Sequence, residues 1–582
     1  MTHPVARRGL VAVLAVLALA LSGCVALPTS GPVVQTRGTD HADTRRASDI
    51  DARPPDPGAS RTEVVAGFLD AMTAWPVQTS VAKEYLTDEA AAGWDPEQET
   101  IIYSDSLPVR EQAGTVSVQL ASADRLDAVG AWRGAATAEE LSLDFRVTIE
   151  DGEYRIADPI DALVVPASWF RQRYRQVSLY YFDPLAQILV PEPVFVPEGD
   201  QLATSLVSGL LTGPPPLAQG VVRSFLPAGL SVGLSVPVDD DGIADIALVG
   251  EGAVTSPKEA ELMLAQLAWT LRQDPSVTAL RVSVDGADLP LPDGVSEYSV
   301  DAAASYGPAG PGGGRALHGL AQGRLVGGTV DGELEPVTGA FGDEGAGLVA
   351  VAVTPDSEWA AAVDLGGRRV RRAPVRETTS QPTPQTLLTG GAYARPTWDN
   401  AGRLWVLERR GADAVVWLVE DDRVRPVRVP GITGTRAREL VVSRDGTRLV
   451  GVVRTPDGDR VVGARVMVGT DGEVRARRPF VVRPPEGSRV ADLAWAGPIR
   501  VALLTRTAPD SPFEVDVVAA DGATVGVEPL STIVTGKVLG LAASPVEDAP
   551  MFAVYADRYV DLVRQESHDA GPAGLTQLDY AG

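Results

Sequence analysis

A motif repeated through the second half of the chain limits its fold more than any other feature. Each copy is a short apolar strand pattern, a tight turn and a second strand pattern, and successive anchor positions are 44, 45, 52 and 49 residues apart. These anchors are Thr354, Trp398, Ser443, Trp495 and Ser544. A period of about 40 to 50 residues is typical of the four-stranded blades of a β-propeller. The repeat therefore predicts an all-β propeller over residues 316–582.

Strand pairs and turns also indicate the number of blades. Asp-Gly pairs at 445–446, 457–458, 471–472 and 521–522 fit the tight turns of hairpins. A further strand pair at 316–330, with a Gly-Arg turn, supplies another copy. We expect about six blades, or seven if the two ends of the repeat share one. The alternative is a pair of β-sandwiches, which do not repeat their turn motif at this interval.

The charge of the chain limits its partners. It carries 77 acidic and 51 basic residues, a formal net charge of -26. No broad basic face is therefore expected to neutralise phosphates, and we predict that nucleic acid is not a partner. An acidic surface also repels anionic lipid headgroups, so attachment to a membrane would have to rest on a covalent lipid.

Cysteine and histidine are too rare for the common reactive sites. Cys24 is the single cysteine, and no histidine occurs between residues 42 and 317. The four histidines are His3, His41, His318 and His568. More than half of the chain thus lacks the usual general base and the commonest metal ligand. We expect no catalytic residues, no metal and no cofactor.

The amino-terminal segment has the layout of an export signal. Arg7 and Arg8 precede twelve apolar residues at 10–21, too few to span a bilayer, which needs about 20. The next residues, Leu21-Ser22-Gly23-Cys24, resemble the bacterial lipobox. The resemblance implies a signal peptide over 1–23, a diacylglycerol thioether on Cys24 and an acylated, for example palmitoylated, new amino terminus. The alternative is an ordinary signal peptide followed by an incidental cysteine.

A tether and a first α+β domain are expected next. Residues 24–60 are rich in proline and small polar residues, and a flexible coil of this length reaches roughly 30 to 36 Å. Over 61–174, apolar spacing predicts helices at 61–75 and 81–86, and alternation predicts a strand at 141–149. Two helices followed by an antiparallel sheet resemble the nuclear-transport-factor-2-like (NTF2-like) fold. Its aromatic residues would line a ligand cavity or, more commonly, form core: Trp75, Tyr85 and Trp94.

A second α+β domain is predicted over 175–303. Strands are expected at 177–182 and 188–196. A first helix should be capped by Asp200 and end at Gly213. A second helix should begin at the capping pattern Ser256-Pro257-Lys258-Glu259. Five segments resemble, in order, the GerMN domain of spore-germination and envelope proteins: 211–214, 225–229, 242–246, 266–271 and 282–286. The resemblance implies a binding or assembly module without accepted catalytic residues.

Two loops in this part of the chain invite a ligand interpretation. Asp239-Asp240-Asp241-Gly242 could be a calcium loop, but adjacent aspartates that run into a strand chelate poorly, so a solvated hairpin turn is favoured. Residues 304–315 form a Gly/Pro linker, whose glycine run lacks the Lys-Ser/Thr of a phosphate-binding loop.

The order of these parts resembles the actinobacterial lipoprotein LpqB family, and 154–163 and 170–174 resemble that family's junction between its first two domains. The resemblance implies a non-enzymatic lipoprotein on the outer face of the cell membrane. It would act with the extracellular region of MtrB, the sensor histidine kinase of the MtrAB two-component system, and so affect cell-envelope homeostasis. The residues that bind the partner are unknown from the sequence.

Two other functions are considered. The chain could bind cell-wall glycan or peptidoglycan, or hydrolyse it with propeller carboxylates such as Asp356, Asp399 and Asp445. These aspartates recur at equivalent blade turns, which favours a structural role. A solute-binding lipoprotein is less favoured, because the two α/β lobes of that class are not predicted.

Overall fold

The computed structural model describes residues 51–582 except 252–255, 290, 292–294, 311–313, 378–382, 470, 484–486, 525–530 and 572–573. The predicted signal peptide and lipobox lie outside the described residues. None of the described helices is long and apolar enough to cross a membrane.

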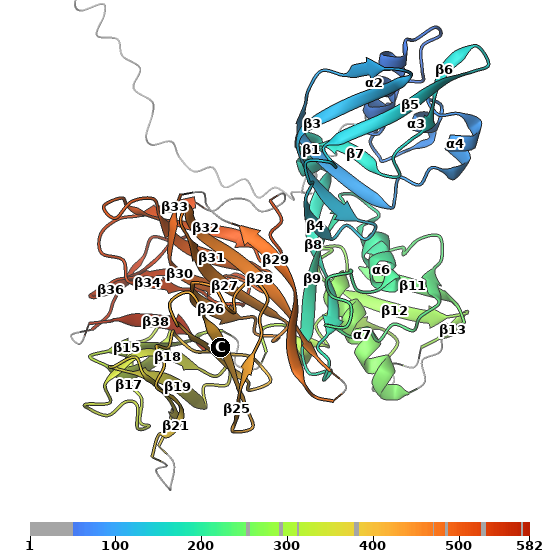
Figure 1. Ribbon diagram of the computed structural model, residues 1–582. Helices are drawn as coiled ribbons and strands as arrows, with labels where there is room; N and C mark the ends of the chain where they lie inside the picture. Colours follow the sequence, from blue (N-terminus) through green and yellow to red (C-terminus); the bar gives the residue numbers. More distant parts are fainter. Residues whose placement is uncertain are drawn as a thin grey trace, which may run out of the picture. The chain divides into compact units, whose positions relative to one another are not determined.

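A seven-stranded sheet with short helices forms the first folded part (Figure 1). Its main strands follow the order β6-β5-β3-β1-β7, with β2 and β4 paired to β3. The helices are α2 (Arg61–Ala71), α3 (Ser80–Lys83), α4 (Asp88–Gly93) and α5 (Ala167–Arg173). The strands are β1 (Glu99–Ser106), β2 (Arg110–Gln112), β3 (Thr115–Asp127), β4 (Trp132–Ala135), β5 (Ser142–Glu150), β6 (Glu153–Asp158) and β7 (Leu163–Pro166).

The first part differs from the sequence prediction in three respects. Helix α2 ends at Ala71, four residues earlier than expected, and the amide of Thr73 bonds the Asp70 carbonyl in a closing turn. The sheet is mixed, because β1 and β7 run parallel. Residues assigned to the tether contact this part, since the Tyr85 hydroxyl donates to the Arg53 carbonyl at 2.8 Å. The NTF2-like assignment stays a prediction.

The second part combines a two-stranded ribbon, a five-stranded sheet and two helices. The ribbon pairs β8 (Tyr174–Phe182) with β9 (Leu189–Pro197), in agreement with the predicted strands. The helices are α6 (Leu202–Thr212) and α7 (Pro257–Leu271), and η2 (Ala304–Tyr306) is a 3₁₀ turn. The sheet contains β10 (Leu230–Val232), β11 (Ile243–Gly250), β12 (Ala279–Val284), β13 (Ala287–Asp288) and β14 (Tyr298–Ser299).

Local signals explain where the two long helices begin and end. The Ser256 hydroxyl accepts from the Glu259 amide at 3.2 Å, and Pro257 occupies the first helical position, as predicted for α7. Gly213 ends α6 with a φ of 94°, which favours glycine. The cap expected at Asp200 is wrong: Gln201 occupies the N-cap position, and its side chain makes no capping hydrogen bond.

Six four-stranded sheets form the third part (yellow-green to red in Figure 1). We number them as blades 1 to 6. Blade 1 contains β17 (Glu335–Pro336), β16 (Arg324–Thr329), β15 (Ala316–Ala321) and β38 (Gln577–Tyr580). Blade 2 contains β18 (Leu348–Val353), β19 (Trp359–Asp364), β20 (Arg369–Pro374) and β21 (Gln385–Thr389). Blade 3 contains β22 (Thr397–Trp398), β23 (Leu404–Glu408), β24 (Val415–Glu420) and β25 (Arg423–Val427).

The remaining blades follow the same strand order. Blade 4 contains β26 (Ala437–Val442), β27 (Arg448–Thr455), β28 (Gly458–Val468) and β29 (Val474–Arg483). Blade 5 contains β30 (Arg489–Trp495), β31 (Arg500–Arg506), β32 (Phe513–Ala519) and β33 (Ser531–Val534). Blade 6 contains β34 (Gly540–Ala542), β35 (Phe552–Val554), β36 (Arg558–Asp561) and β37 (Ser567–Asp569).

The blades close into a ring around an axis. Strands β38, β18, β22, β26, β30 and β34 lie next to one another in that order, and β34 returns to β38. Blade 1 joins the two ends of the repeat, because the C-terminal strand β38 pairs with β15. The six sheets agree with the predicted count of about six, and the ends share one of these six blades without adding a seventh.

The two ends of the ring are distinguished by their loops. We call the end with the turns that follow the innermost strands, such as the Ser443–Thr447 turn, the first face. The end with the loops that lead into the innermost strands is the second face. Strand β27 runs from the first face at Arg448 to the second face near Arg454, so the faces lie about 20 Å apart.

Candidate functional site

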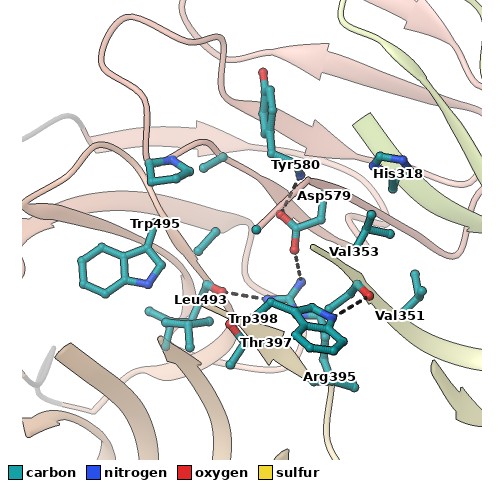
Figure 2. Close-up of a pocket in the computed structure, with 17 residues that line it drawn as sticks. His318, Val351, Val353, Arg395, Thr397, Trp398, Leu493, Trp495, Asp579 and Tyr580 are labelled. Carbon is teal, nitrogen blue, oxygen red and sulfur yellow. Dashed lines mark hydrogen bonds and ion pairs between the residues drawn. The ribbon is translucent and has the colours of Figure 1, made fainter. Parts of the chain in front are cut away.

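Four charged side chains lie on or beside the innermost strands, near the axis of the propeller. They are Arg395, Glu439, Asp492 and Asp579. The guanidinium of Arg395 is 3.1 Å from a carboxylate oxygen of Asp492. It is also 3.1 Å from a carboxylate oxygen of Asp579 and donates to the Leu493 carbonyl at 2.8 Å (Figure 2). One cation is thus shared among carboxylates of different blades, which ties the blades together.

The protonation of this cluster is set by its burial. Burial lowers the pKa of Arg395, but attraction to Asp492, Asp579 and Glu439 outweighs it and raises that pKa overall. Burial raises the pKa of Asp579 to about 6, although Arg395 opposes the shift. Burial, with repulsion from Asp492, also raises the pKa of Glu439. The raised pKa values of Asp579 and Glu439 both favour the protonated carboxyl, which reduces the repulsion among the acidic groups around Arg395.

An axial pocket adjoins the Arg395 cluster (Figure 2). His318, Trp398, Trp495 and Tyr580 contribute ring side chains to its lining, and it offers about 40 Å³ of space to water. That volume is close to the share of one water molecule in the liquid, about 30 Å³, and far below the roughly 300 Å³ of a small-molecule site. The pocket therefore suits water and not a cofactor.

Buried aspartates hold the turns of the first face. The Asp399 carboxylate accepts from the amides of Ala401 and Arg403, at 3.1 and 3.0 Å, and pairs with the Arg403 guanidinium at 2.8 Å. The Asp445 carboxylate accepts from the Ser443 hydroxyl at 2.7 Å and from the Thr447 amide at 2.8 Å. Because these bonds tie each carboxylate to backbone amides and side chains of its own turn, both aspartates serve as turn caps.

The third predicted carboxylate, Asp356, occupies the equivalent turn of blade 2. It accepts from the Thr354 hydroxyl at 2.5 Å and from the Glu358 amide at 3.0 Å. In blades 2, 3 and 4 alike, the aspartate accepts from the amide two residues later, which supports the structural interpretation of all three aspartates over a catalytic one.

A groove on the first face lies beside this turn. Asp356, Trp359, Arg372, Asp399 and Asp422 are among its lining residues, and it encloses about 420 Å³ of solvent space. The Trp359 side chain is 39% exposed, with the Arg372 guanidinium 5.1 Å from its ring centre. Arg372 also pairs with Asp422 at 2.5 Å. This groove joins an aromatic surface to charged hydrogen-bonding groups.

The ribbon β8–β9 is joined to blade 4 by a buried ionic cluster. Glu192 of β9 pairs with Arg448 at 2.9 Å and also with Arg465, and Arg448 donates to the Pro191 carbonyl at 2.6 Å. All three charged side chains are at most 7% exposed. Burial, together with Arg448, lowers the pKa of Arg465. Because buried charges are costly unless paired, this cluster fixes the second part against the propeller.

Most other residues singled out in the sequence take structural positions. Tyr85 and Trp94 are buried in the core of the first part, and Trp75 packs edge-on against Trp169 with ring centres 5.9 Å apart. The aspartates at 239–241 form an exposed turn in which Asp239 accepts from the amides of Asp241 and Ile243. Among the described residues, no cluster of His, Cys, Asp and Glu is arranged to hold a metal.

The sequence did not predict the Arg395 cluster at the axis or the Glu192 cluster between the second part and blade 4. Arg395, Glu439 and Asp492 occur three or four residues before the anchors Trp398, Ser443 and Trp495. The recurrence of charged residues at matching positions of the repeat could therefore have predicted a charged cluster at the propeller axis. Glu192 gave no comparable signal, because its partners are more than 250 positions away.

Three protein-family models match the chain in order. Residues 54–171 match the N-terminal domain of lipoprotein LpqB, residues 178–290 match the Germane family of sporulation and spore germination, and residues 323–547 match the β-propeller domain of lipoprotein LpqB. The predicted GerMN-type domain and C-terminal propeller are confirmed by these matches and by the strand order.

Similar proteins extend over most of the chain. Lipoprotein LpqB of Thermobifida fusca is 29% identical over 549 residues, which cover 84% of this chain and 86% of the relative. Lipoprotein LpqB of Cutibacterium acnes is 25% identical over 583 residues, 96% of each chain. A solved structure, the tandem GerMN domains of the sporulation protein GerM from Bacillus subtilis, matches at 22% identity over 22% of this chain and 46% of that one, with a TM-score of 0.19.

Proposed function

This chain belongs to the LpqB lipoprotein family, and from that premise we propose that it is a membrane-anchored, non-enzymatic accessory protein of a two-component system. Its partner is the extracellular domain of the sensor histidine kinase MtrB, on the outer face of the cell membrane. Family membership is the observation that carries this proposal. The similar proteins are named as lipoproteins, and their names mention no enzymatic activity.

The folded architecture supports a docking role. A closed ring of blades gives a rigid wall with variable loops at both faces, and the Glu192 cluster joins it to the second part. The axial pocket is too small to hold any part of a folded partner, so the partner is expected to contact the outer surface of the chain. Rigid surfaces lose little conformational freedom when they bind, which favours recognition of a folded domain.

The mechanism follows from linkage. A protein that binds one state of the sensor domain more tightly than the other shifts the equilibrium between them by the difference in binding free energy. A tenfold difference in affinity corresponds to about 1.4 kcal/mol. No chemical step is required of this chain, since the kinase performs the phosphorylation.

The proposal is tested by direct binding. The mature chain from residue 24, with Cys24→Ser so that no lipid is attached, is titrated with the purified extracellular domain of the kinase in a calorimeter. We expect saturable 1:1 binding, and the extracellular domain of an unrelated sensor kinase serves as the control. Lack of binding by a correctly folded chain would refute the proposed partner.

The membrane anchor has a separate test. We propose that Cys24, which lies outside the described residues, carries the diacylglycerol. In cells fed a labelled fatty acid, Cys24→Ser should abolish labelling of the protein and stop cleavage of residues 1–23. Persistence of both would contradict a lipobox at Leu21-Ser22-Gly23-Cys24.

The groove beside Trp359 favours a second candidate function, the binding of cell-wall glycan. An exposed indole offers an apolar surface to a sugar ring, and Asp356, Asp422 and Arg372 supply groups that bond hydroxyls. Trp359→Ala should lower the retention of the chain on purified peptidoglycan several-fold. Leu365→Ala, an exposed apolar side chain outside the groove, is the matched control. Equal retention of both variants and the unmodified chain would remove this candidate.

A further inference from the structure

A cleft on the second face of the propeller is lined by four arginines. They come from four places in the chain: the end of β23, the loop before β26, the start of β26 and the end of β27. The full lining is Ala392, Arg409, Gly411, Ala412, Arg436, Ala437, Arg438 and Arg454. We call it the arginine cleft. Its other lining residues are glycine and alanine, so its only charged walls are guanidinium groups.

The cleft is built for a ligand of moderate size. It encloses about 540 Å³ of solvent space, within the range of roughly 300 to 1,000 Å³ that small-molecule sites occupy. Its other lining residues have little or no side-chain bulk, which leaves space between the arginines. It also lies at the opposite end of β27 from Arg448, where the second part of the chain contacts blade 4.

A break in the strand register turns one of these arginines outward. In blade 4, Ala437 pairs with Val453 and Glu439 pairs with Val452, so Arg438 is the extra residue of a bulge. A bulge redirects the side chain of the unpaired residue. Blades 2 and 5 have the same irregularity at Val349 and Ala491. The bulge therefore belongs to the architecture, but of these three blades only blade 4 places a cation on it.

Two of the four arginines are fixed and two are unpaired. Arg454 is held by Asp459 at 3.0 and 3.1 Å, and Arg409 donates to the Tyr393 carbonyl at 3.2 Å. Arg436 and Arg438 are exposed and form no ion pair or side-chain hydrogen bond with any described residue. In a chain with a net charge of -26, carboxylates to neutralise them are abundant elsewhere. Unpaired like charges brought together repel one another, and an anion would relieve that repulsion.

From this convergence we propose that the arginine cleft is a binding site for a phosphate-bearing anion. Guanidinium groups donate paired, parallel hydrogen bonds to phosphate oxygens, and one phosphate offers several acceptors to arginines from different segments. Arg438 and Arg436 contact the phosphate, while Arg454 and Arg409, each held by a hydrogen bond to a neighbouring group, form the fixed walls beside them. This site is independent of the kinase-binding proposal, which would survive its loss.

Calorimetric titration of the mature chain carrying Cys24→Ser tests the site. The soluble probe is inorganic pyrophosphate, and in a second arm the chain is floated with vesicles of phosphatidylcholine containing phosphatidylglycerol. The test variant is Arg436→Glu with Arg438→Glu, and the neutral pair Arg436→Ala with Arg438→Ala is measured beside it. Arg564→Glu is the matched control, because Arg564 is an exposed arginine of blade 6 without an ion pair among the described residues.

We expect the unmodified chain to bind a phosphate probe, with affinity that falls as NaCl is raised. The glutamate pair should weaken binding at least tenfold, the alanine pair less, and Arg564→Glu should leave it unchanged. Binding of pyrophosphate would identify a soluble phosphate compound as the ligand class, and binding of vesicles alone would identify a lipid headgroup. If neither probe binds, or if the glutamate pair binds as well as the control, the site is refuted.

Discussion

Two groups of arginines, one on each face of the propeller, lie in opposite environments. On the first face, Arg448 and Arg465 are buried against Glu192, and Arg444 donates to the carbonyls of Ala309 and Ala581. On the second face, Arg436 and Arg438 are exposed and unpaired within the described residues. Burial with a partner makes a guanidinium part of the fold, and exposure without one leaves it free for a ligand. The environment of each arginine, and not its residue type, separates the two roles.

The largest effect is expected from a substitution in the Glu192 cluster on the first face, where the arginines are buried and paired. Glu192→Ala would leave Arg448 and Arg465 buried without their carboxylate, which should lower the free energy of unfolding by about 3–5 kcal/mol. Chemical denaturation at pH 7 measures the change. Glu198→Ala removes an exposed carboxylate that follows β9 and should cost less than about 0.5 kcal/mol. Equal effects of the two substitutions would mean that the Glu192 cluster does not join the two parts.

A smaller effect concerns the axis between the faces. Burial lowers the pKa of His318 from 6.5 to about 4, so the unfolded chain binds a proton between these values and the folded chain does not. Stability contributed by the neutral ring should therefore be lost as the pH falls from about 6.5 through 4. The full loss is about 3 kcal/mol, since one pKa unit corresponds to about 1.4 kcal/mol.

Comparison with His318→Leu isolates this contribution. The raised pKa of Asp579, about 6, acts in the opposite direction, because its stabilising proton is lost as the pH rises from about 4 through 6. The contribution of Asp579 is present in both the unmodified chain and the His318→Leu variant, so it cancels in the comparison. Denaturation between pH 4 and 7 should show a shallower loss of stability in the leucine variant as the pH falls. Parallel curves for the two proteins would contradict a buried, neutral His318.

A helix cap gives a reference point away from both faces. Ser256→Ala removes the acceptor for the Glu259 amide at the start of α7 and should cost about 1 kcal/mol. Thermal unfolding of this variant measures the cost of losing one helix cap, with which the stability losses of the propeller variants can be compared. A cost as large as that of Glu192→Ala would show that stability measurements do not discriminate between these two environments.

The smallest expected effect completes the comparison. Arg436→Ala with Arg438→Ala should change the free energy of unfolding by less than about 0.5 kcal/mol, because the two side chains are exposed and make no ion pair with described residues. Chemical denaturation measures it alongside Glu192→Ala. A loss above about 2 kcal/mol would assign these arginines to the fold and remove the contrast between the faces.

The sequence predicted what depends on local order and missed what depends on distant contacts. Strand alternation, turn pairs and the cap at Ser256 are encoded within a few residues, so β8, β9, α7 and the blade repeat were found. Helix α2 was predicted too long, because the apolar spacing continues through Met72 and Trp75 after the helix has ended.

The sites followed the same rule. The structural role predicted for the turn aspartates from their repetition agrees with the turn hydrogen bonds of Asp399 and Asp445. The arginine cleft and the Glu192 cluster each combine segments that no sequence pattern connects, since convergence depends on how the ring closes. The net charge of -26 led us to expect no broad basic face. A net charge, however, gives no information about where a few arginines cluster, so the arginine cleft was not anticipated.

The central claim is that this chain modulates a kinase by binding it, and kinase output tests that claim most directly. The lipidated chain and the full-length kinase are reconstituted together in proteoliposomes, and the rate of kinase autophosphorylation is measured as the chain is titrated. The account predicts a saturable change in the rate, which needs the folded chain and is absent with a heat-denatured sample. An unchanged rate at saturating, correctly folded lipoprotein would contradict it.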